Sequence, residues 1–184
     1  MITVALDPAA VTVAVAGRGP SALRRLSLLR AAGAHPLFFS DLPLQGLDVP
    51  YGAFRQRLPS ESDLAGLSAL WIVGLPRQDA VALAAQARLG RVLVNVEDDS
   101  PLCDFHNVAE VRRGDLLLTV ATGGRSPAVA ARIRARLAQE FGPEWAERLA
   151  TLGAWRQAWR AEGRSAAEVV RLTDAALLRA GWTV

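Results

Sequence analysis

A glycine-rich turn between an apolar run and a helical pattern is the feature that most constrains the fold of this chain. The turn is Gly17-Arg18-Gly19-Pro20-Ser21-Ala22; it follows the apolar run Val11 to Val15 and precedes a helical pattern from Leu23 to Ala32. A strand-to-helix turn with few side chains exposes backbone N–H groups and the positive end of a helix dipole. The sequence therefore predicts a strand, a turn that suits an anion, and a helix.

The first 100 residues continue this alternation of strand and helix signals. The expected strands are short, apolar and β-branched or aromatic, and lie at Val11–Val15, Leu37–Phe39, Leu70–Val73 and Val92–Val96. Amphipathic helical patterns at 22–32 and 79–89 separate them, and the segment between Pro43 and Leu67 leaves room for one short strand. Continuous apolar strands in this rhythm predict an α/β fold with a Rossmann-like parallel sheet covered on both faces.

The pattern changes after Pro101. Two strand-like runs, Val108–Arg112 and Leu116–Val120, flank a Gly-containing turn and predict a hairpin. A helix at about 128–141 and a Trp-rich helical tail at 144–181 follow. We expect three parts: a Rossmann domain at 1–107, a small α+β dimerisation region at 108–142, and a helical C-terminal domain at 143–184. This appendage is too thin to bury itself well, so a homodimer is expected.

Composition argues against several partner classes. All 21 basic residues are Arg, they are scattered along the chain, and the net charge is only +3, so nucleic-acid binding is not expected. No uncharged run reaches the length of a membrane span, and the N-terminus does not resemble a signal peptide. The single cysteine, Cys103, permits no internal disulfide, which favours the cytoplasm.

Gly17, Gly19 and Ala22 match the dinucleotide-binding fingerprint, in which small residues allow a tight turn and the approach of a pyrophosphate. The pattern alone is weak, and a plain tight turn is the alternative. Its place after a strand and before a helix favours dinucleotide binding, with Pro20 and Ser21 in the same turn. Arg18 could reach the phosphates or could be solvated, and the sequence leaves this open.

Asp41 lies 22 residues after Gly19, just beyond an expected strand. An acidic residue at this position binds the ribose hydroxyls of NAD in many Rossmann domains. Asp41 and its neighbour Leu42 are therefore expected to contact the cofactor. No Arg follows nearby to hold a 2′-phosphate, which favours NAD over NADP. The alternative is that Asp41 only shapes a turn before Pro43.

Glu97, Asp98 and Asp99 follow directly after an expected strand, at the sheet edge where α/β proteins bind ligands. Grouped carboxylates raise one another's pKa, which suits a general base. If the chain stays extended, Glu97 and Asp99 point to one side and Asp98 to the other. A turn cap without catalytic function is the alternative.

A second glycine turn, Thr122-Gly123-Gly124-Arg125-Ser126, offers N–H groups, hydroxyls and a guanidinium to an anion. It lacks the Gly-Lys-Ser/Thr of a nucleoside triphosphate loop, so a phosphate and a carboxylate fit it equally well. The two glycine turns around an acidic cluster indicate a site for two anionic ligands. His35, His106 and Cys103 lack metal-ligand spacing, so no metal site is expected.

Four segments together resemble the precorrin-2 dehydrogenase and sirohydrochlorin ferrochelatase family, the N-terminal module of siroheme synthases. They are Val-Ala-Gly-Arg-Gly-Pro-Ser-Ala-Leu-Arg-Arg (15–25), Val-Asn-Val-Glu-Asp-Asp-Ser-Pro-Leu-Cys-Asp-Phe (94–105), Arg-Arg-Gly-Asp-Leu (112–116) and Ala-Thr-Gly-Gly-Arg-Ser-Pro (121–127). The resemblance covers about residues 1–140, and the Asn-Val-x-Asp and Thr-Gly-Gly-x-Ser-Pro motifs carry most of its specificity.

The resemblance implies an NAD-binding Rossmann domain, a dimerisation region that also binds tetrapyrrole, and a cytoplasmic homodimer. It implies oxidation of precorrin-2 to sirohydrochlorin with NAD, followed in some members by insertion of ferrous iron. The family's key aspartate corresponds to Asp98, and the resemblance implies that Asp98 is the proton acceptor. Asn95 belongs to the same motif. The turn from Thr122 through Gly123, Gly124 and Arg125 to Ser126 resembles the part that cradles the acidic substrate, beside Arg132 and Arg136.

Three segments depart from the family. Its triple glycine is Gly17-Arg18-Gly19 here, and its strand ending Ala-Thr-Asp is replaced by Val73-Gly74-Leu75-Pro76. Where it has Phe-x-x-Pro-Ala, this chain has Phe105-His106-Asn107-Val108-Ala109. A non-catalytic dinucleotide- or tetrapyrrole-binding protein on the same fold is therefore the alternative to a dehydrogenase.

Overall fold

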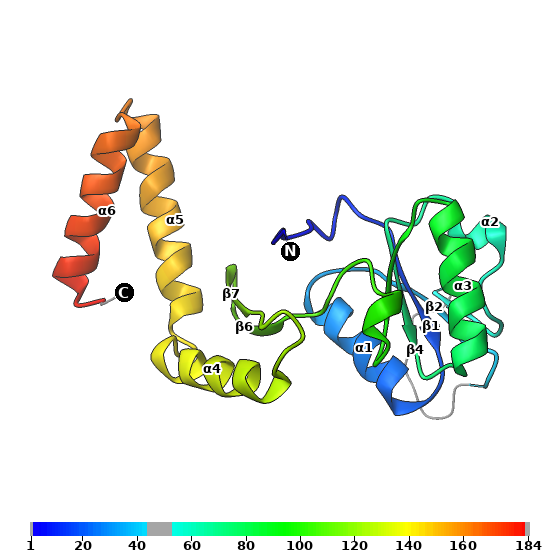
Figure 1. Ribbon diagram of the computed structural model, residues 1–184. Coiled ribbons are helices and arrows are strands. Elements are labelled where there is room, and N and C mark those ends of the chain that lie inside the picture. Colours follow the sequence, from blue (N-terminus) through cyan, green and yellow to red (C-terminus); the bar gives the residue numbers. More distant parts are fainter. Residues whose placement is uncertain (1, 44–52, 183–184) are drawn as a thin grey trace. The chain divides into compact units, whose positions relative to one another are not determined.

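The computed structural model describes residues 2–43 and 53–182 (Figure 1). The chain forms two compact units, Met1–Asn107 and Val108–Val184. The first holds a parallel sheet with helices, and the second holds a hairpin and three helices.

The first unit is built on a five-stranded sheet in the order β3-β2-β1-β4-β5, and every neighbouring pair is parallel. The strands are β1 (Val13–Gly17), β2 (Leu37–Phe39), β3 (Phe54–Arg55), β4 (Ala69–Val73) and β5 (Leu93–Val96). The helices are α1 (Gly19–Ala31), the short α2 (Glu61–Leu64) and α3 (Arg77–Leu89), with a 3₁₀ turn, η1 (Ser100–Leu102), after β5. This strand order confirms the Rossmann-like parallel sheet that the sequence predicts.

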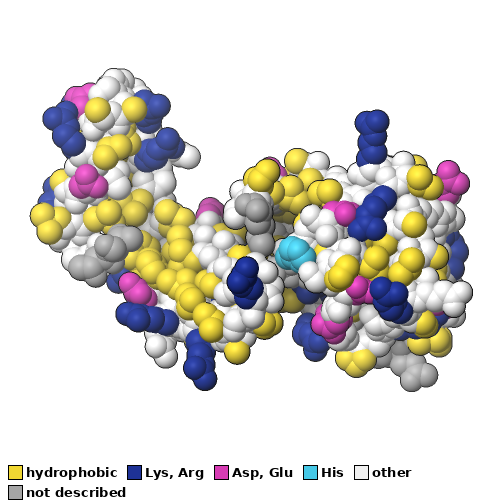
Figure 2. All heavy atoms as spheres, in the orientation of Figure 1, with side chains coloured by type: hydrophobic (Ala, Val, Ile, Leu, Met, Phe, Trp, Pro, Cys, Tyr) yellow, Lys and Arg dark blue, Asp and Glu magenta, His cyan; other side chains and the backbone are white. Residues whose placement is uncertain are grey.

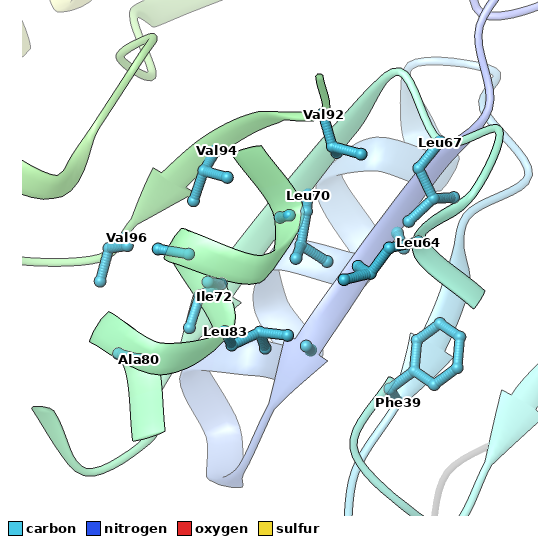
Figure 3. Close-up of a cluster of buried hydrophobic side chains, with 14 residues drawn as sticks. Phe39, Leu64, Leu67, Leu70, Ile72, Ala80, Leu83, Val92, Val94 and Val96 are labelled. Atoms are coloured by element: carbon cyan, nitrogen blue, oxygen red, sulfur yellow. The ribbon is translucent and has the colours of Figure 1, made fainter. Parts of the chain in front are cut away.

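Alternate residues of the strands fill two cores, one on each face of the sheet. Ala14, Ala16, Leu70 and Ile72 belong to the core that α2 and α3 complete, and its side chains point toward one another in Figure 3. Val13, Val15, Trp71 and Val73 face the other side, where Ala22 and Leu26 of α1 cover them. This alternation follows from the twofold side-chain period of a strand and explains why all five residues of β1 and of β4 are buried.

The second unit begins with an antiparallel hairpin, β6 (Ala109–Arg113) and β7 (Leu116–Val120), which confirms the predicted hairpin. Three helices follow: α4 (Pro127–Glu140), α5 (Trp145–Ala161) and α6 (Ala166–Ala180). Arg113 connects the hairpin to α4. Its Nε donates a hydrogen bond to the carbonyl of Phe141 at 2.9 Å, and its Nη2 donates one to the carbonyl of Ala138 at 3.1 Å. These carbonyls lie at the C-terminal end of α4, where a cation is favourable.

The predicted helical tail consists of two helices, α5 and α6. Gly163 adopts a left-handed φ of +80°, and Ser165 and Glu168 form a capping box that starts α6. Trp155 and Trp159 share a face of α5, as their spacing predicts, with ring centroids 6.3 Å apart. No helix within residues 2–43 and 53–182 is long and apolar enough to cross a membrane.

The boundaries of some helices and strands differ from the prediction, because the geometry of the turns overrides the local sequence pattern. β1 runs through Gly17 instead of ending at Val15, because Val13–Gly17 pairs with Ala69–Val73 of β4. α1 begins at Gly19 rather than Ala22, with Pro20 in its first turn, a favourable place for proline. In the segment between Pro43 and Leu67, the described residues from 53 onward hold the short strand that the sequence left room for, and also α2, which the sequence did not indicate.

Replacing Gly17 with Ala should destabilise the protein. A Cβ at Gly17 would lie 2.1 Å from the carbonyl oxygen of Val73, so backbone must move. We expect the free energy of unfolding to fall by about 1–3 kcal/mol, the usual effect of overpacking. Urea unfolding, followed by a signal from the first unit, measures this loss. The matched variant Gly153→Ala, in α5, meets no described atom within 4 Å. It should be neutral or stabilising by roughly 0.5–1 kcal/mol. Equal effects of the two variants would contradict the packing argument.

Candidate functional site

Two glycines hold the carboxyl ends of β1 and β4 against each other. Gly17 leaves room for the carbonyl of Val73, which accepts a hydrogen bond from the backbone N–H of Arg18 at 3.0 Å. Gly74, at a φ of +66°, lies under the carbonyl oxygen of Arg18, where a Cβ would come within 2.5 Å. The order of the sheet reverses between β1 and β4, and open α/β sheets bind ligands at such a point.

The N-terminus of α1 is open toward this point. Gly19 has a left-handed φ of +72°, and no described atom lies within 4 Å of where its Cβ would be. No side chain among the described residues caps the helix, so its first N–H groups are available to an anion. Ser21 in the same turn accepts a hydrogen bond from Arg24 Nη2 at 2.8 Å. These features fit the pyrophosphate end of a dinucleotide.

Asp41 lies after β2 and pairs with Arg18. Arg18 Nε donates to Asp41 Oδ1 at 2.7 Å, and Arg18 Nη2 donates to Oδ2 at 2.5 Å. The hydrogen bonds from Arg18 hold the pKa of Asp41 below its usual range, and the same bonds raise the pKa of Arg18. In this structure the guanidinium of Arg18 is paired with Asp41, and a contact between Arg18 and the phosphates of a cofactor stays a prediction.

The turn that carries Asp41 is shaped by its neighbours. Ser40 is buried, and its Oγ accepts a hydrogen bond from the N–H of Leu42 at 3.3 Å. Leu42 is exposed, beside Asp41. The structure therefore brings the glycine turn and Asp41 together through Arg18 and leaves an apolar side chain exposed next to them.

The acidic residues after β5 do not stay extended, so the condition under which Glu97 and Asp99 would point to one side is not met. β5 ends at Val96, and Asp98 adopts a left-handed φ of +62° in the following turn. Asp99 is bound by Arg77, whose Nε lies 3.0 Å from Oδ2. Asp98 is exposed, and its carboxylate makes no hydrogen bond or ion pair with another described residue. A non-glycine residue in this strained conformation is a reason to look for function.

Arg25 of α1 adds a cation near the acidic turn, which the sequence did not indicate. Burial lowers the pKa of Arg25, and the charge of Glu97 opposes that shift. Its Nε is buried with no hydrogen-bond partner among the described residues. Arg25 of α1 therefore balances part of the negative charge of this turn.

Asn95, expected to contact substrate, is buried with an exposed fraction of 4%. Its Nδ2 donates to the carbonyl of Phe105 at 2.9 Å, and its Oδ1 accepts from Asn107 Nδ2 at 2.9 Å. Asn107 in turn accepts from Trp71 Nε1 at 2.9 Å. The amide of Asn95 therefore fastens the segment after η1 to the sheet, and a contact between Asn95 and substrate stays a prediction.

Cys103 also positions the acidic turn. Val96 N–H donates to its Sγ at 3.2 Å, and the Sγ lies at the same distance from the carbonyl oxygen of Val96. The thiol therefore pairs with the last residue of β5, immediately before the acidic residues. Among the described residues no group of three or more His, Cys, Asp or Glu is arranged to hold a metal ion.

The second glycine turn lies in the other unit. Thr122 Oγ1 accepts from the N–H of Ser126 at 3.3 Å, and Ser126 Oγ caps α4 by accepting from the N–H of Val129 at 3.3 Å. Gly123 and Gly124 have left-handed φ values of +62° and +76° and are exposed, as is Arg125. The turn is thus closed by its hydroxyls and exposes its glycine backbone.

Replacing Asn95 with Ala should reduce stability. The change leaves the Phe105 carbonyl and the Asn107 amide without their partner, and one lost buried hydrogen-bond partner costs about 1–3 kcal/mol. Urea unfolding measures the loss. Asn107→Ala, which breaks the same network from its more accessible end, should reproduce most of it. Full stability in Asn95→Ala would contradict the positioning role.

The chain is similar to known proteins in sequence and in fold. A family model described as putative NAD(P)-binding matches residues 4–109. Siroheme synthase of Chromobacterium violaceum is 34% identical over 141 residues, which cover 74% of this chain and 30% of that protein. Siroheme synthase 1 of Cronobacter sakazakii is 33% identical over 137 residues, which cover 68% of this chain and 27% of that protein. The chain thus spans about a third of the length of these relatives or less.

The fold as a whole is similar to that of a solved structure, SirC, precorrin-2 dehydrogenase. The TM-score is 0.71 at 21% identity, and the match covers 95% of this chain and 88% of that one. The resemblance noted in the sequence is thereby confirmed. The chain belongs to the putative NAD(P)-binding family, and it is similar to a part of the siroheme synthases.

Proposed function

We propose that this chain oxidises precorrin-2 to sirohydrochlorin with NAD, with Asp98 as the proton acceptor. The observation that carries the proposal is the exposed, unpaired carboxylate of Asp98 at the carboxyl edge of the sheet that also bears the glycine turn and Asp41. The similarity to siroheme synthases and to SirC, precorrin-2 dehydrogenase, supports this substrate.

The dinucleotide would be held by the glycine turn and by the turn after β2. The N–H groups at the start of α1, including those of Gly19 and Ser21, suit the pyrophosphate, with Pro20 in the first helical turn. Asp41 suits the adenosine ribose, with Leu42 exposed beside it for the adenine. When bound, NAD accepts a hydride from the substrate.

The reaction balances as a loss of two electrons and two hydrogens from precorrin-2. One hydrogen leaves as hydride to NAD, and the other leaves as a proton to the carboxylate of Asp98. Because Asp98 is exposed, it can return that proton to water and regain its charge before the next turnover. Its freedom from any described cation leaves its oxygens available to the proton.

The acidic substrate would be bound by the second glycine turn. Gly123, Gly124 and Arg125 are exposed, and Arg132 and Arg136 are exposed on α4, which follows the turn. Guanidinium groups and free N–H groups are the partners that carboxylates prefer. If ferrous iron is a second substrate, the macrocycle nitrogens would hold it without protein ligands. Asp98 would then accept the protons that these nitrogens lose.

We further propose a cytoplasmic homodimer. The second unit buries few apolar side chains (Val111, Ala130, Trp145, Val169 and Ala176) and exposes several large ones (Val108, Val129, Ile133, Trp155, Val170 and Leu178). On the face shown in Figure 2, apolar side chains gather over α4 and α5. A two-stranded sheet is marginal by itself, so a partner surface would stabilise this unit.

Asp98→Asn should abolish turnover while leaving NAD binding intact. Asn tolerates the left-handed conformation at this position, so the turn should survive and only the proton acceptor is lost. We expect kcat to fall by about 10²-fold or more, measured anaerobically from NADH and sirohydrochlorin absorbance, with NAD affinity by calorimetry.

Asp99→Asn is the matched comparison, because it removes the adjacent carboxylate, which Arg77 already binds. Its effect on kcat should be much smaller. If the wild-type protein binds NAD but oxidises no precorrin-2, the dehydrogenase proposal fails and a binding protein on the same fold is favoured. Equal losses in both variants would argue against a specific role for Asp98.

Sedimentation velocity of the intact chain should give twice the mass of one 19.6 kDa chain. Ile133→Asp, on the exposed apolar face of α4, should shift the protein toward monomer without unfolding it. Arg134→Asp, a neighbouring polar position on the same helix, should not. A monomeric wild type at micromolar concentration would contradict the dimer.

A further inference from the structure

Arg18 places a cation where the adenosine ribose would bind, and we propose that this residue lets the site accept NADP as well as NAD. The inference rests on the proposed dinucleotide binding. In the sequence no Arg follows soon after Asp41, and this absence favoured NAD over NADP. In the structure the basic residue comes from the preceding glycine turn, 23 residues earlier.

An acidic residue after the second strand favours NAD for two reasons. Its oxygens accept hydrogen bonds from the ribose hydroxyls, and its charge repels a 2′-phosphate. Both oxygens of Asp41 are already occupied, one by Arg18 Nε and one by Arg18 Nη2. Each carboxylate oxygen keeps a further lone pair, so the ribose hydroxyls compete with the guanidinium for Asp41, and the charge that would repel a phosphate is partly offset by Arg18. Both reasons for preferring NAD are weakened at once.

The side chain of Arg18 can also reorient toward a phosphate while its backbone stays in place. Its backbone is fixed, because its N–H bonds to Val73 and its carbonyl lies over Gly74. Its side chain keeps an exposed fraction of 26%, so the guanidinium can be reached from solvent. A guanidinium binds phosphate oxygens in the same two-bonded geometry that it uses on Asp41. Exchange of Asp41 for a 2′-phosphate therefore needs a change of side-chain rotamer only.

A second carboxylate explains why NAD should still bind. Asp79, in the first turn of α3, has its Oδ2 3.8 Å from Arg18 Nη2. Two carboxylates then share one guanidinium, so these three side chains keep a net negative charge, which favours NAD and limits the affinity for NADP. Dual use of the two cofactors follows, rather than a complete preference for NADP.

Calorimetry of the intact chain with NAD and with NADP tests the inference. The wild-type protein should bind the two with dissociation constants of the same order. Arg18→Ala should weaken NADP binding about tenfold or more, the loss expected for charge-assisted hydrogen bonds, and should leave NAD binding unchanged or tighter. Asp41→Asn should weaken NAD binding and spare NADP binding.

Arg88→Ala is the matched control, because Arg88 also forms an Arg–Asp pair, with Asp104 at 3.0 Å, but at the C-terminal end of α3, away from the glycine turn. It should change neither affinity. Arg18→Gln, which keeps hydrogen-bond donors but loses the charge, should also weaken NADP binding, and it replaces Arg18→Ala if that variant unfolds. Tight NAD binding with no NADP binding, or an unchanged affinity ratio in the Arg18 variants, would overturn the inference alone. No binding of either cofactor would overturn the proposed function as well.

Discussion

The close contact between the β1–α1 turn and the β4–α3 turn is the constraint on which the candidate site depends. Gly17 admits the Val73 carbonyl, and Gly74 admits the carbonyl of Arg18, so each turn occupies space that a side chain on the other would fill. The two helix starts are thereby held at the point where the strand order reverses. The departure of this chain from its family at Gly74 is thus part of a fitted pair, since a residue with a Cβ there would meet backbone.

Charge at the sheet edge is organised around that contact. Because the backbone of Arg18 is fixed on both sides, its side chain extends toward β2 and meets Asp41, with Asp79 nearby. Arg77, in the first turn of α3, takes Asp99 in the same way. Two Arg residues at the starts of α1 and α3 therefore bind three acidic residues at this edge of the sheet. Such exposed pairs contribute little stability, so their importance lies in which oxygens they occupy and which they leave open.

The fold was largely predictable from the sequence, because its strands are continuous apolar runs bounded by Gly and Pro. The boundaries of its elements were less predictable. Pairing with β4 extends β1 to Gly17, and α2 depends on a local capping box rather than on hydrophobic periodicity. The glycine turn and Asp41 could be proposed from their positions, whereas the choice of Asp98 among three acidic residues came from the family resemblance. Two facts could not: that Arg18 reaches Asp41, and that the Asn95 amide faces inward to Phe105 and Asn107. Both are contacts between residues distant in sequence or on opposite sides of a turn, for which spacing carries no signal.

The conformation of Asp98 connects this arrangement to chemistry. An Asp at a φ of +62° is costly unless the surroundings impose it, and here Cys103 and the Asn95 network hold the chain on both sides of the turn. An extended chain would have sent alternate carboxylates to opposite faces of the sheet. The turn instead exposes one carboxylate, while the carboxylate of its neighbour Asp99 is bound by Arg77. A proton acceptor needs oxygens that no cation occupies, and among the acidic residues described at this edge Asp98 meets that need best.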